Sequence, residues 1–329
     1  MDTQASTNNE LITLTKPERH HFSYHGVGSD LAIVMLKNII LTIITFGIYS
    51  PWARTNTRRF FWSNTAFKGD RFTYTGTGKE LFKGWIKVFG IFFLFAIGVQ
   101  ILMLFLPKSF KPAAGLFMLP IYIYIFSIAI YSGLRYRALR TLWRQIRFNV
   151  VRNKELVREF TLLFAKGSIF SGLTFGIYLP YFTNQKHHFL FNKISYGGIP
   201  FSYDGEDKEY FMICIKGFFL SLITLGIYTP WFFLNRFEYR LSHTHIGNNS
   251  FHIALKGEKF LVYGLVSYFG TLLSFGLALP WIINWGLSLV FDNTYLEGPL
   301  DLSGVKNEAG DESATGEDLV SAYDLDLGF

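Results

Sequence analysis

Six long apolar runs constrain this chain more than any other feature. They cover residues 31–52, 84–106, 113–134, 160–182, 210–233 and 260–285, and none contains Asp, Glu, Arg or His. A helix needs about 20 apolar residues to cross about 30 Å of hydrocarbon. Only 17% of the residues are charged, whereas soluble domains carry charge on about a quarter of theirs. The sequence predicts an all-α polytopic membrane protein with about six transmembrane helices.

Basic residues are distributed unevenly around these runs. Loops 53–83, 135–158 and 234–259 hold nineteen Lys and Arg, against eight in the N-terminal segment, the other loops and the C-terminal tail. Cytoplasmic loops are enriched in Lys and Arg. We expect a multi-pass protein with those three loops in the cytoplasm and both termini outside. A span count wrong by one would reverse the side of the C-terminal tail.

The net charge of +7 does not indicate nucleic-acid binding, because the basic residues lie between apolar runs. We expect the partners to be the lipid bilayer and its anionic phospholipid headgroups, and no nucleic acid. Self-association and a membrane partner stay open. The last 29 residues hold eight acids and one Lys, so residues 301–329 are predicted to be disordered.

The chain contains an internal repeat. Shifting the sequence by 179 residues aligns 22–26 with 201–205 and 45–52 with 224–231 without a gap. The string Thr-x-Gly-Ile-Tyr-x-Pro-aromatic returns at 174–181, and in weaker form at 274–281, where Ser274 and Ala278 replace Thr and Tyr. Four of the six predicted spans therefore end alike.

Short extended segments of the type Phe-x-Tyr-x-Gly open the repeats, at Phe22, Phe72, Phe201 and Phe251. These openings divide the chain into a polar N-terminal tail, a transmembrane domain of four repeat units and an acidic tail. The parts are 1–21; 22–300, with units at about 22–71, 72–200 with an inserted helical hairpin, 201–250 and 251–300; and 301–329.

The repeated opening and the Thr-x-Gly-Ile-Tyr-x-Pro-Trp string resemble the YjgN family of uncharacterised bacterial inner-membrane proteins, over about residues 20 to 300. The family has no established activity or substrate. The resemblance therefore implies a location in the inner (plasma) membrane and an architecture, and nothing about chemistry.

The repeated string predicts a helix boundary. Thr can bond to a carbonyl one turn back, Gly loosens a helix, and the residue before Pro avoids the helical region. We interpret the string as a helix end with interfacial aromatic anchors, the alternative being a broken helix that lines a binding site. Its residues are Thr45, Gly47, Tyr49, Pro51, Trp52, Thr174, Gly176, Tyr178, Pro180, Thr224, Gly226, Tyr228, Pro230, Trp231, Gly276, Pro280 and Trp281.

A second pattern places a lysine seven residues, or two helical turns, after an acid. The pairs are Asp30/Lys37, Glu80/Lys87, Glu159/Lys166 and Glu209/Lys216. The lysines are candidate contacts for a substrate or for lipid anions. The simpler interpretation is that they reach back to lipid phosphates at the interface; the other is an anion-binding group inside the bundle.

Two further segments receive plainer interpretations. Leu139, Leu142, Trp143, Ile146 and Val150 recur at helical spacing beside arginines, which predicts an interfacial helix on an anionic leaflet. The histidines lie outside the predicted spans, so we expect no metal site and no cofactor. Cys214 is interpreted as an apolar filler.

The sequence carries no enzyme signature, so we expect a protein that is not an enzyme. Repeats of alternating orientation, Gly/Pro-interrupted spans and buried lysines favour a transporter or channel for a small solute, with anions among the candidates. The alternative is a non-catalytic scaffold or a lipid- or partner-binding protein. If the repeat arms gathered on one face of the membrane, that alternative would become the better one.

Overall fold

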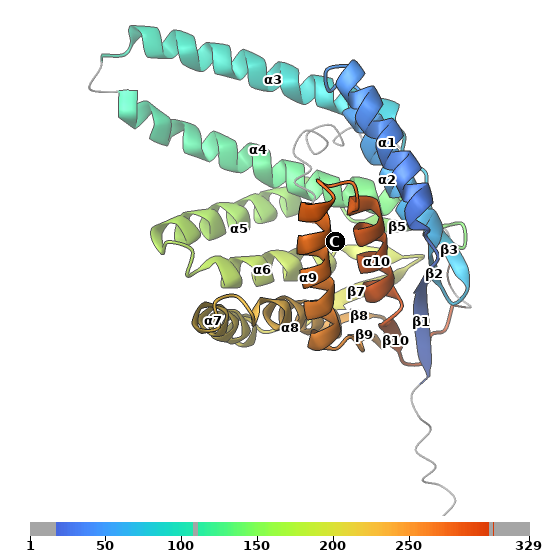
Figure 1. The fold of residues 1–329 in the computed structure, drawn as a ribbon. Coiled ribbons are helices and arrows are strands. Elements are labelled where there is room, and N and C mark those ends of the chain that lie inside the picture. Colours follow the sequence, from blue (N-terminus) through green and yellow to red (C-terminus); the bar gives the residue numbers. More distant parts are fainter. Residues whose placement is uncertain (1–17, 108–110, 303–304, 306–329) are drawn as a thin grey trace, which may run out of the picture.

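A computed structural model describes residues 18–107, 111–302 and 305; within α3 and α4, the side chains of 87–89, 91–92, 102 and 111–117 lie outside the description. Five successive units have the order strand, helix, helix, strand (Figure 1). The helices are α1 (Gly28–Ile44), α2 (Ser50–Asn64), α3 (Gly78–Phe105), α4 (Lys111–Arg140), α5 (Lys154–Leu173), α6 (Leu179–Phe191), α7 (Asp207–Ile223), α8 (Thr229–Ser242), α9 (Gly257–Leu273) and α10 (Leu279–Phe291). The strands are β1 (Arg19–Tyr24), β2 (Thr65–Phe67), β3 (Asp70–Tyr74), β4 (Thr141–Trp143), β5 (Ile146–Val150), β6 (Ile194–Tyr196), β7 (Ile199–Tyr203), β8 (Thr244–Ile246), β9 (Asn249–Ile253) and β10 (Thr294–Glu297).

The ten strands form a closed antiparallel barrel in which each strand pairs with its neighbours in the sequence. Two-residue turns join one unit to the next, with positive φ at Lys68 and Gly69 and at Gly197 and Gly198. Such turns match the twist of paired strands. The ring closes where β1 pairs with β10, with Arg19 opposite Glu297. Closure removes the free strand edges that would otherwise pair with another chain.

The barrel interior is filled by two layers of five side chains, one from each unit. The first is a ring of phenylalanines whose neighbouring ring centroids lie 6.2–6.5 Å apart: Phe22, Phe72, Phe148, Phe201 and Phe251. The second is a buried cluster of Phe67, Trp143, Tyr196, Ile246 and Leu296. Leu300, Leu302 and Val305 pack against this cluster. The barrel is therefore a packed core.

The structure overturns the prediction of an all-α fold with six spans. The chain forms a β-barrel, which an all-α fold lacks. In addition, four of the six apolar runs each fold into a helix, a sharp turn and the start of a second helix. In the first run Phe46 has φ 50° and Gly47 has φ 90°, and the Gly47 amide donates to the Thr42 carbonyl oxygen (2.8 Å), which closes a helix C-terminus. Hydropathy alone does not register this turn, because its residues are as apolar as the helices beside it.

The threonine of the repeated string holds the turn together. Thr45 Oγ1 donates to the Leu41 carbonyl oxygen (2.7 Å) and accepts from the Tyr49 amide (3.0 Å). Thr174 and Thr224 make the same two bonds, and Ser274 accepts from the amide of Ala278. The following proline lies in the first turn of the second helix, where its missing N–H is not needed.

The range 72–200 contains two of the five units. In the first of them α3 and α4 are 28 and 30 residues long and extend beyond the other hairpins (Figure 1). The second opens at Phe148, where Val150 stands in the place of the expected tyrosine. The predicted interfacial helix over Leu139 to Val150 is wrong, because α4 ends at Arg140 and a β-hairpin of β4 and β5 follows.

The second helix of one unit is bonded to the strand that opens the next. Tyr203 Oη donates to Asn184 Oδ1 (2.5 Å), and Asn184 Nδ2 donates to the Gly205 carbonyl oxygen (2.9 Å). Tyr24 and Asn284 make the equivalent pair, with the hydroxyl 3.1 Å from the amide oxygen. The same junction therefore also occurs where the barrel closes, between the fifth unit and the first.

Two other junctions replace this polar pair with apolar packing. Leu234 and Ile253, at the positions of Asn and Tyr, lie in one buried cluster. Tyr131 and Val150 lie in another. At these four junctions the residues at the two positions differ together, as expected when a buried polar group needs its partner. The fifth junction has Thr55 and Tyr74, and so keeps the tyrosine without the asparagine.

We predict that Asn184 and Tyr203 are strongly coupled in their contributions to the free energy of unfolding. Replacing Asn184 with Leu removes the acceptor of a buried hydroxyl, which costs about 1–3 kcal/mol. Adding Tyr203→Ile reproduces the Leu234–Ile253 pair, so the double variant should lose less stability than the two single variants together. Unfolding in mild detergent measures the three free energies, and strictly additive losses would contradict the junction described here.

Candidate functional site

A cavity of about 680 Å³ lies above the phenylalanine ring, where α1, α2, α4 and α10 come together. Phe22 and Phe72 line it, so the top of the barrel core forms its floor. Its remaining lining residues are Met35, Asn38, Ile39, Ala53, Arg54, Thr57, Arg58, Phe61, Trp62, Thr65, Arg137, Thr141, Ile283, Leu287 and Phe291. The walls are thus largely apolar and aromatic.

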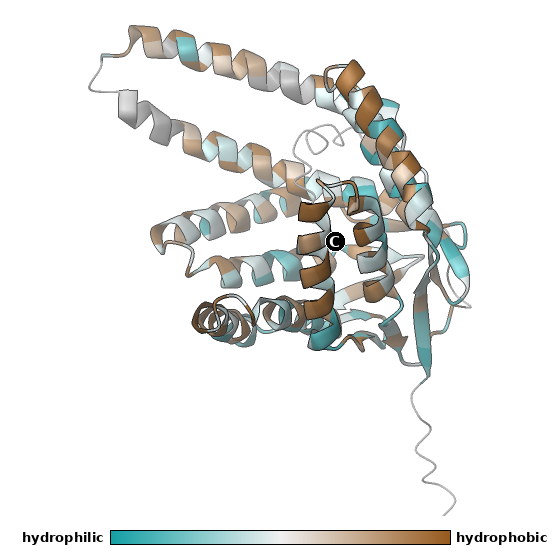
Figure 2. Ribbon diagram, in the orientation of Figure 1, coloured by the Kyte–Doolittle hydropathy of each residue, from teal (hydrophilic) through white to brown (hydrophobic). Residues whose placement is uncertain are grey.

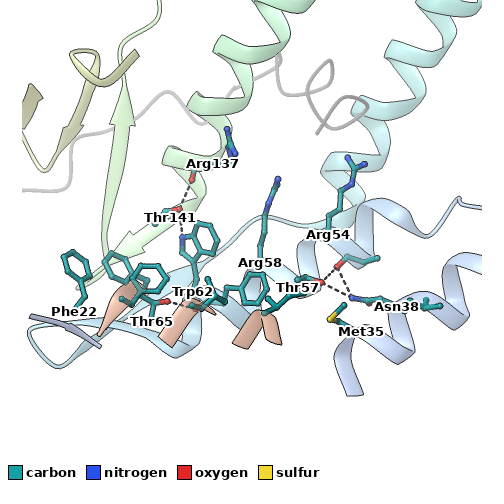
Figure 3. A pocket seen from close by; sticks show the side chains of 17 residues that line it. Phe22, Met35, Asn38, Arg54, Thr57, Arg58, Trp62, Thr65, Arg137 and Thr141 are labelled. Carbon is teal, nitrogen blue, oxygen red and sulfur yellow. Dashed lines mark hydrogen bonds between the residues drawn. The ribbon is translucent and has the colours of Figure 1, made fainter. Parts of the chain in front are cut away.

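Three arginines supply the charge of this cavity, and none of its lining residues is acidic. Arg54 and Arg58 come from α2, one turn apart, and Arg137 comes from the last turn of α4. Figure 3 shows the three guanidinium groups on one side of the cavity, pointing away from Phe22 and Thr65. Arg58 is only 9% exposed. The electrostatic field of the cavity therefore favours an anion.

The neutral polar groups of the cavity bond mainly to the protein itself. Asn38 Nδ2 donates to the Ala53 carbonyl oxygen (3.0 Å) and to Thr57 Oγ1 (3.2 Å). Trp62 Nε1 donates to Thr141 Oγ1 (2.9 Å), which donates to the Arg137 carbonyl oxygen (2.8 Å). These bonds join α1 to α2, and α2 to the junction of α4 and β4, and so fix the helices that carry the arginines.

One more arginine occupies a position equivalent to that of a cavity arginine. Arg240 of α8 lies four residues before Thr244 of β8, as Arg137 of α4 lies four residues before Thr141 of β4, and each threonine donates to the carbonyl oxygen of its arginine. Arg240 and Lys186 both act on His187, which packs edge-on against Tyr203 with ring centroids 4.6 Å apart. Burial, followed by these positive charges, lowers the pKa of His187 to about 3.

The structure places the predicted lysines away from this cavity. Lys37, Lys166 and Lys216 lie on exposed faces of the first helices of their hairpins. Lys37 lines a second hollow of about 330 Å³ together with Arg59 and Asn56. The side chain of Lys87 lies outside the described residues. The structure does not bring the lysines together, so contact with lipid anions stays a prediction for each of them.

The residues of the repeated string lie at the turns of four hairpins and line neither hollow. Tyr49 stacks on Trp52, Tyr178 on Tyr181 and Tyr228 on Trp231, with centroids 6.0, 5.7 and 6.2 Å apart. Trp52, Trp231 and Trp281 also pack against the glycine that opens the first helix of the next unit: Gly78, Gly257 and Gly28. A side chain on any of these glycines would collide with the indole.

The cavity arginines escaped the sequence analysis because they lie in loops expected to flank the spans. A repeat-by-repeat alignment of the second helices could have found Arg137 and Arg240, which share one position. Within the described part of the chain, no group of three or more His, Cys, Asp or Glu residues could hold a metal ion. Cys214 is buried in α7.

A family model described as "Bacterial protein of unknown function (DUF898)" matches residues 19–206 and 198–234, more than half of the chain. The chain belongs to this family. It is similar to the inner membrane protein YjgN of Escherichia coli K12, with 36% identity over 132 residues, and of Salmonella typhimurium, with 28% identity over 140 residues.

The alignments cover 40% and 43% of this chain, and 31% and 33% of the two relatives. The chain thus spans about a third of the length of the curated relatives it matches. These matches confirm the resemblance to the YjgN family and the location in the inner membrane. No solved structure matches the chain significantly.

One long helical segment of the structure is consistent with a location in the membrane. Among the described residues, Met118–Arg140 of α4 is the segment long and apolar enough to cross a membrane. The shorter apolar helices include α10 (Leu279–Phe291).

We predict that His187 makes this YjgN-family protein less stable in acid. Its pKa of about 3 in the fold lies below the ordinary 6.5, so the unfolded chain binds the proton more readily between these values. The contribution is fully present above pH 6.5 and is lost as the pH falls toward 3, with a slope of at most about 1.4 kcal/mol per pH unit.

The His187→Phe variant should show a flatter decline of melting temperature between pH 7 and pH 4 than the parent protein. His188→Phe is the matched control, because His188 is exposed. Identical pH profiles for the parent and the His187 variant would show that the imidazole does not remain neutral in the fold.

Proposed function

We propose that this protein binds an anionic amphiphile, a lipid with a phosphate-containing headgroup, in the cavity between α1, α2, α4 and α10. The observation that carries the proposal is the combination of three arginines with apolar and aromatic walls in a hollow free of acids. Guanidinium groups bind phosphate oxygens through paired hydrogen bonds. The apolar walls suit the first part of an acyl chain, and the volume of about 680 Å³ is typical of ligand sites.

A lipid-binding role is favoured over a transporter for a small solute by two observations. The barrel is filled by two layers of side chains, so its axis offers no passage in this structure. Ser63 and Ser242 lie at the ends of α2 and α8 that lead into the barrel, and Ser195 lies in the barrel strand β6, so the repeat arms gather at one end of the molecule. Transport stays a prediction, as does the absence of an enzymatic activity.

We predict that a short-chain phosphatidylglycerol raises the melting temperature of the protein in a non-ionic detergent. Phosphatidylcholine with the same chains tests whether binding needs a lipid with a net negative charge. Inorganic phosphate tests whether the headgroup anion alone is sufficient. Ligands that bind only the folded state stabilise it by mass action. The proposal expects a clear shift with phosphatidylglycerol, and smaller shifts with the other two probes.

Replacing both Arg58 and Arg137 with Gln should weaken this binding at least about tenfold, because each charged hydrogen bond contributes about 1.5–3 kcal/mol. The matched control replaces Lys68 and Arg71 with Gln, which removes the same charge from exposed positions on the barrel. Equal loss in both double variants would indicate nonspecific attraction. Unchanged binding in the cavity variant would refute the proposed site.

A further inference from the structure

Four of the five helical hairpins end in an apolar side chain that contacts almost nothing in the protein. At the turns, Phe46, Phe175, Leu225 and Phe275 are 98%, 99%, 95% and 96% exposed. Each has φ near 50°, a conformation that non-glycine residues rarely adopt. A soluble surface would favour Asn or Gly at such a position, since both adopt this conformation readily and tolerate water.

The exposed apolar surface continues from each turn into both helices. The last residues of the first helices are exposed as well, among them Ile43 and Ile44 of α1 and Ile223 of α7. Figure 2 shows hydrophobic residues along much of α1 and α9. Exposed apolar surface of this extent marks a contact with lipid or with another protein.

The stretch around each of these four turns, which we call the cap of the hairpin, has no charged residue. Residues 38–53, 167–185, 217–235 and 260–291 contain no Asp, Glu, Lys or Arg. The first three caps are bounded at their start by Lys37, Lys166 and Lys216, each eight residues before the threonine or its equivalent in the string. The lysines therefore lie at the same depth on three hairpins, and their side chains are exposed.

The distance from these lysines to the turns corresponds to one leaflet. Nine residues separate Lys37 from Phe46, which is about 13 Å of helix at 1.5 Å per residue. The hydrocarbon core of a bilayer is about 30 Å thick. A lysine held at the phosphate level would therefore place the turn near the middle of the bilayer.

We infer that the hairpins α1/α2, α5/α6, α7/α8 and α9/α10 dip into one leaflet of the bilayer and return to the side from which they came. The partner of this surface is the hydrocarbon interior, with anionic headgroups at the level of the lysines. The stacked Tyr–Trp and Tyr–Tyr pairs then lie between the turn and the headgroups, where aromatic side chains are enriched.

The barrel lies on the cytoplasmic side in this arrangement. Basic residues are frequent at the barrel end, for example Lys68, Arg71, Arg144 and Arg147, and absent from the four turns. Positive charge stays in the cytoplasm. The expectation of a periplasmic N-terminal segment depended on the six-span count, which the structure overturns. The longer hairpin α3/α4 contains the segment that can cross completely.

Cysteine labelling tests this topology directly. Single cysteines replace Phe46, Phe175 or Leu225 at the turns, and Ser63, Ser195 or Ser242 at the barrel end, in a Cys214→Ala background. An impermeant maleimide is applied to intact spheroplasts and to inverted membrane vesicles. The three serine positions should label in inverted vesicles alone, and the three turn positions should label in neither until detergent dissolves the membrane.

Two results would overturn the inference. Labelling of the turns in intact spheroplasts would show that the hairpins cross the bilayer. Labelling of the turns in inverted vesicles, alongside Ser63, would show that they remain in water. The turn variants should melt in detergent at the temperature of the Cys-free parent, because the replaced side chains contact so little of the protein; a large loss would mean that the turns pack within the fold.

Discussion

Closure of the barrel between β1 and β10 is the interaction on which the rest of the structure depends. The pairing of Arg19 to His21 with Tyr295 to Glu297 joins the first unit to the fifth and completes the phenylalanine ring. An isolated strand–helix–helix–strand unit would expose its edges and its aromatic side chain. The five units therefore stabilise one another, and the closed ring fixes α2, α4 and α10 around the cavity.

The sequence revealed the repeat but not the structure that each copy forms. The Thr-x-Gly-Ile-Tyr string was found at all four places where it forms a turn. The apolar residues at its centre made each helix pair look like one span, because a left-handed Phe-Gly or Leu-Gly pair does not interrupt hydropathy. Phe148 was missed because Val150 replaces the tyrosine, and the lengthened second unit obscured the spacing. Leu139 to Val150 imitated a helical pattern although the backbone turns into strands.

In the candidate site, too, the sequence predicted features that depend on spacing along one helix, but not those that depend on tertiary packing. The lysines were identified by spacing along a helix, and the structure places three of them on exposed faces near the proposed headgroup level. The cavity arginines come from two consecutive units, Arg58 in α2 and Arg137 in α4, and tertiary packing brings them to one hollow, to which α10 contributes across the closed seam. A ring of hairpins above a packed barrel thus combines a membrane-facing rim with a basic interior, as binding of an anionic lipid requires.

One cross-link tests ring closure most directly. Arg19 and Glu297 face each other across the seam, with Arg19 Nε 2.9 Å from a Glu297 carboxylate oxygen. Both are replaced by Cys in a Cys214→Ala background and oxidised in the native membrane. The account predicts a disulfide within a single chain, seen as faster migration of the monomer on a non-reducing gel. Absence of the bond, or its formation solely between two chains, would contradict a barrel closed by one molecule.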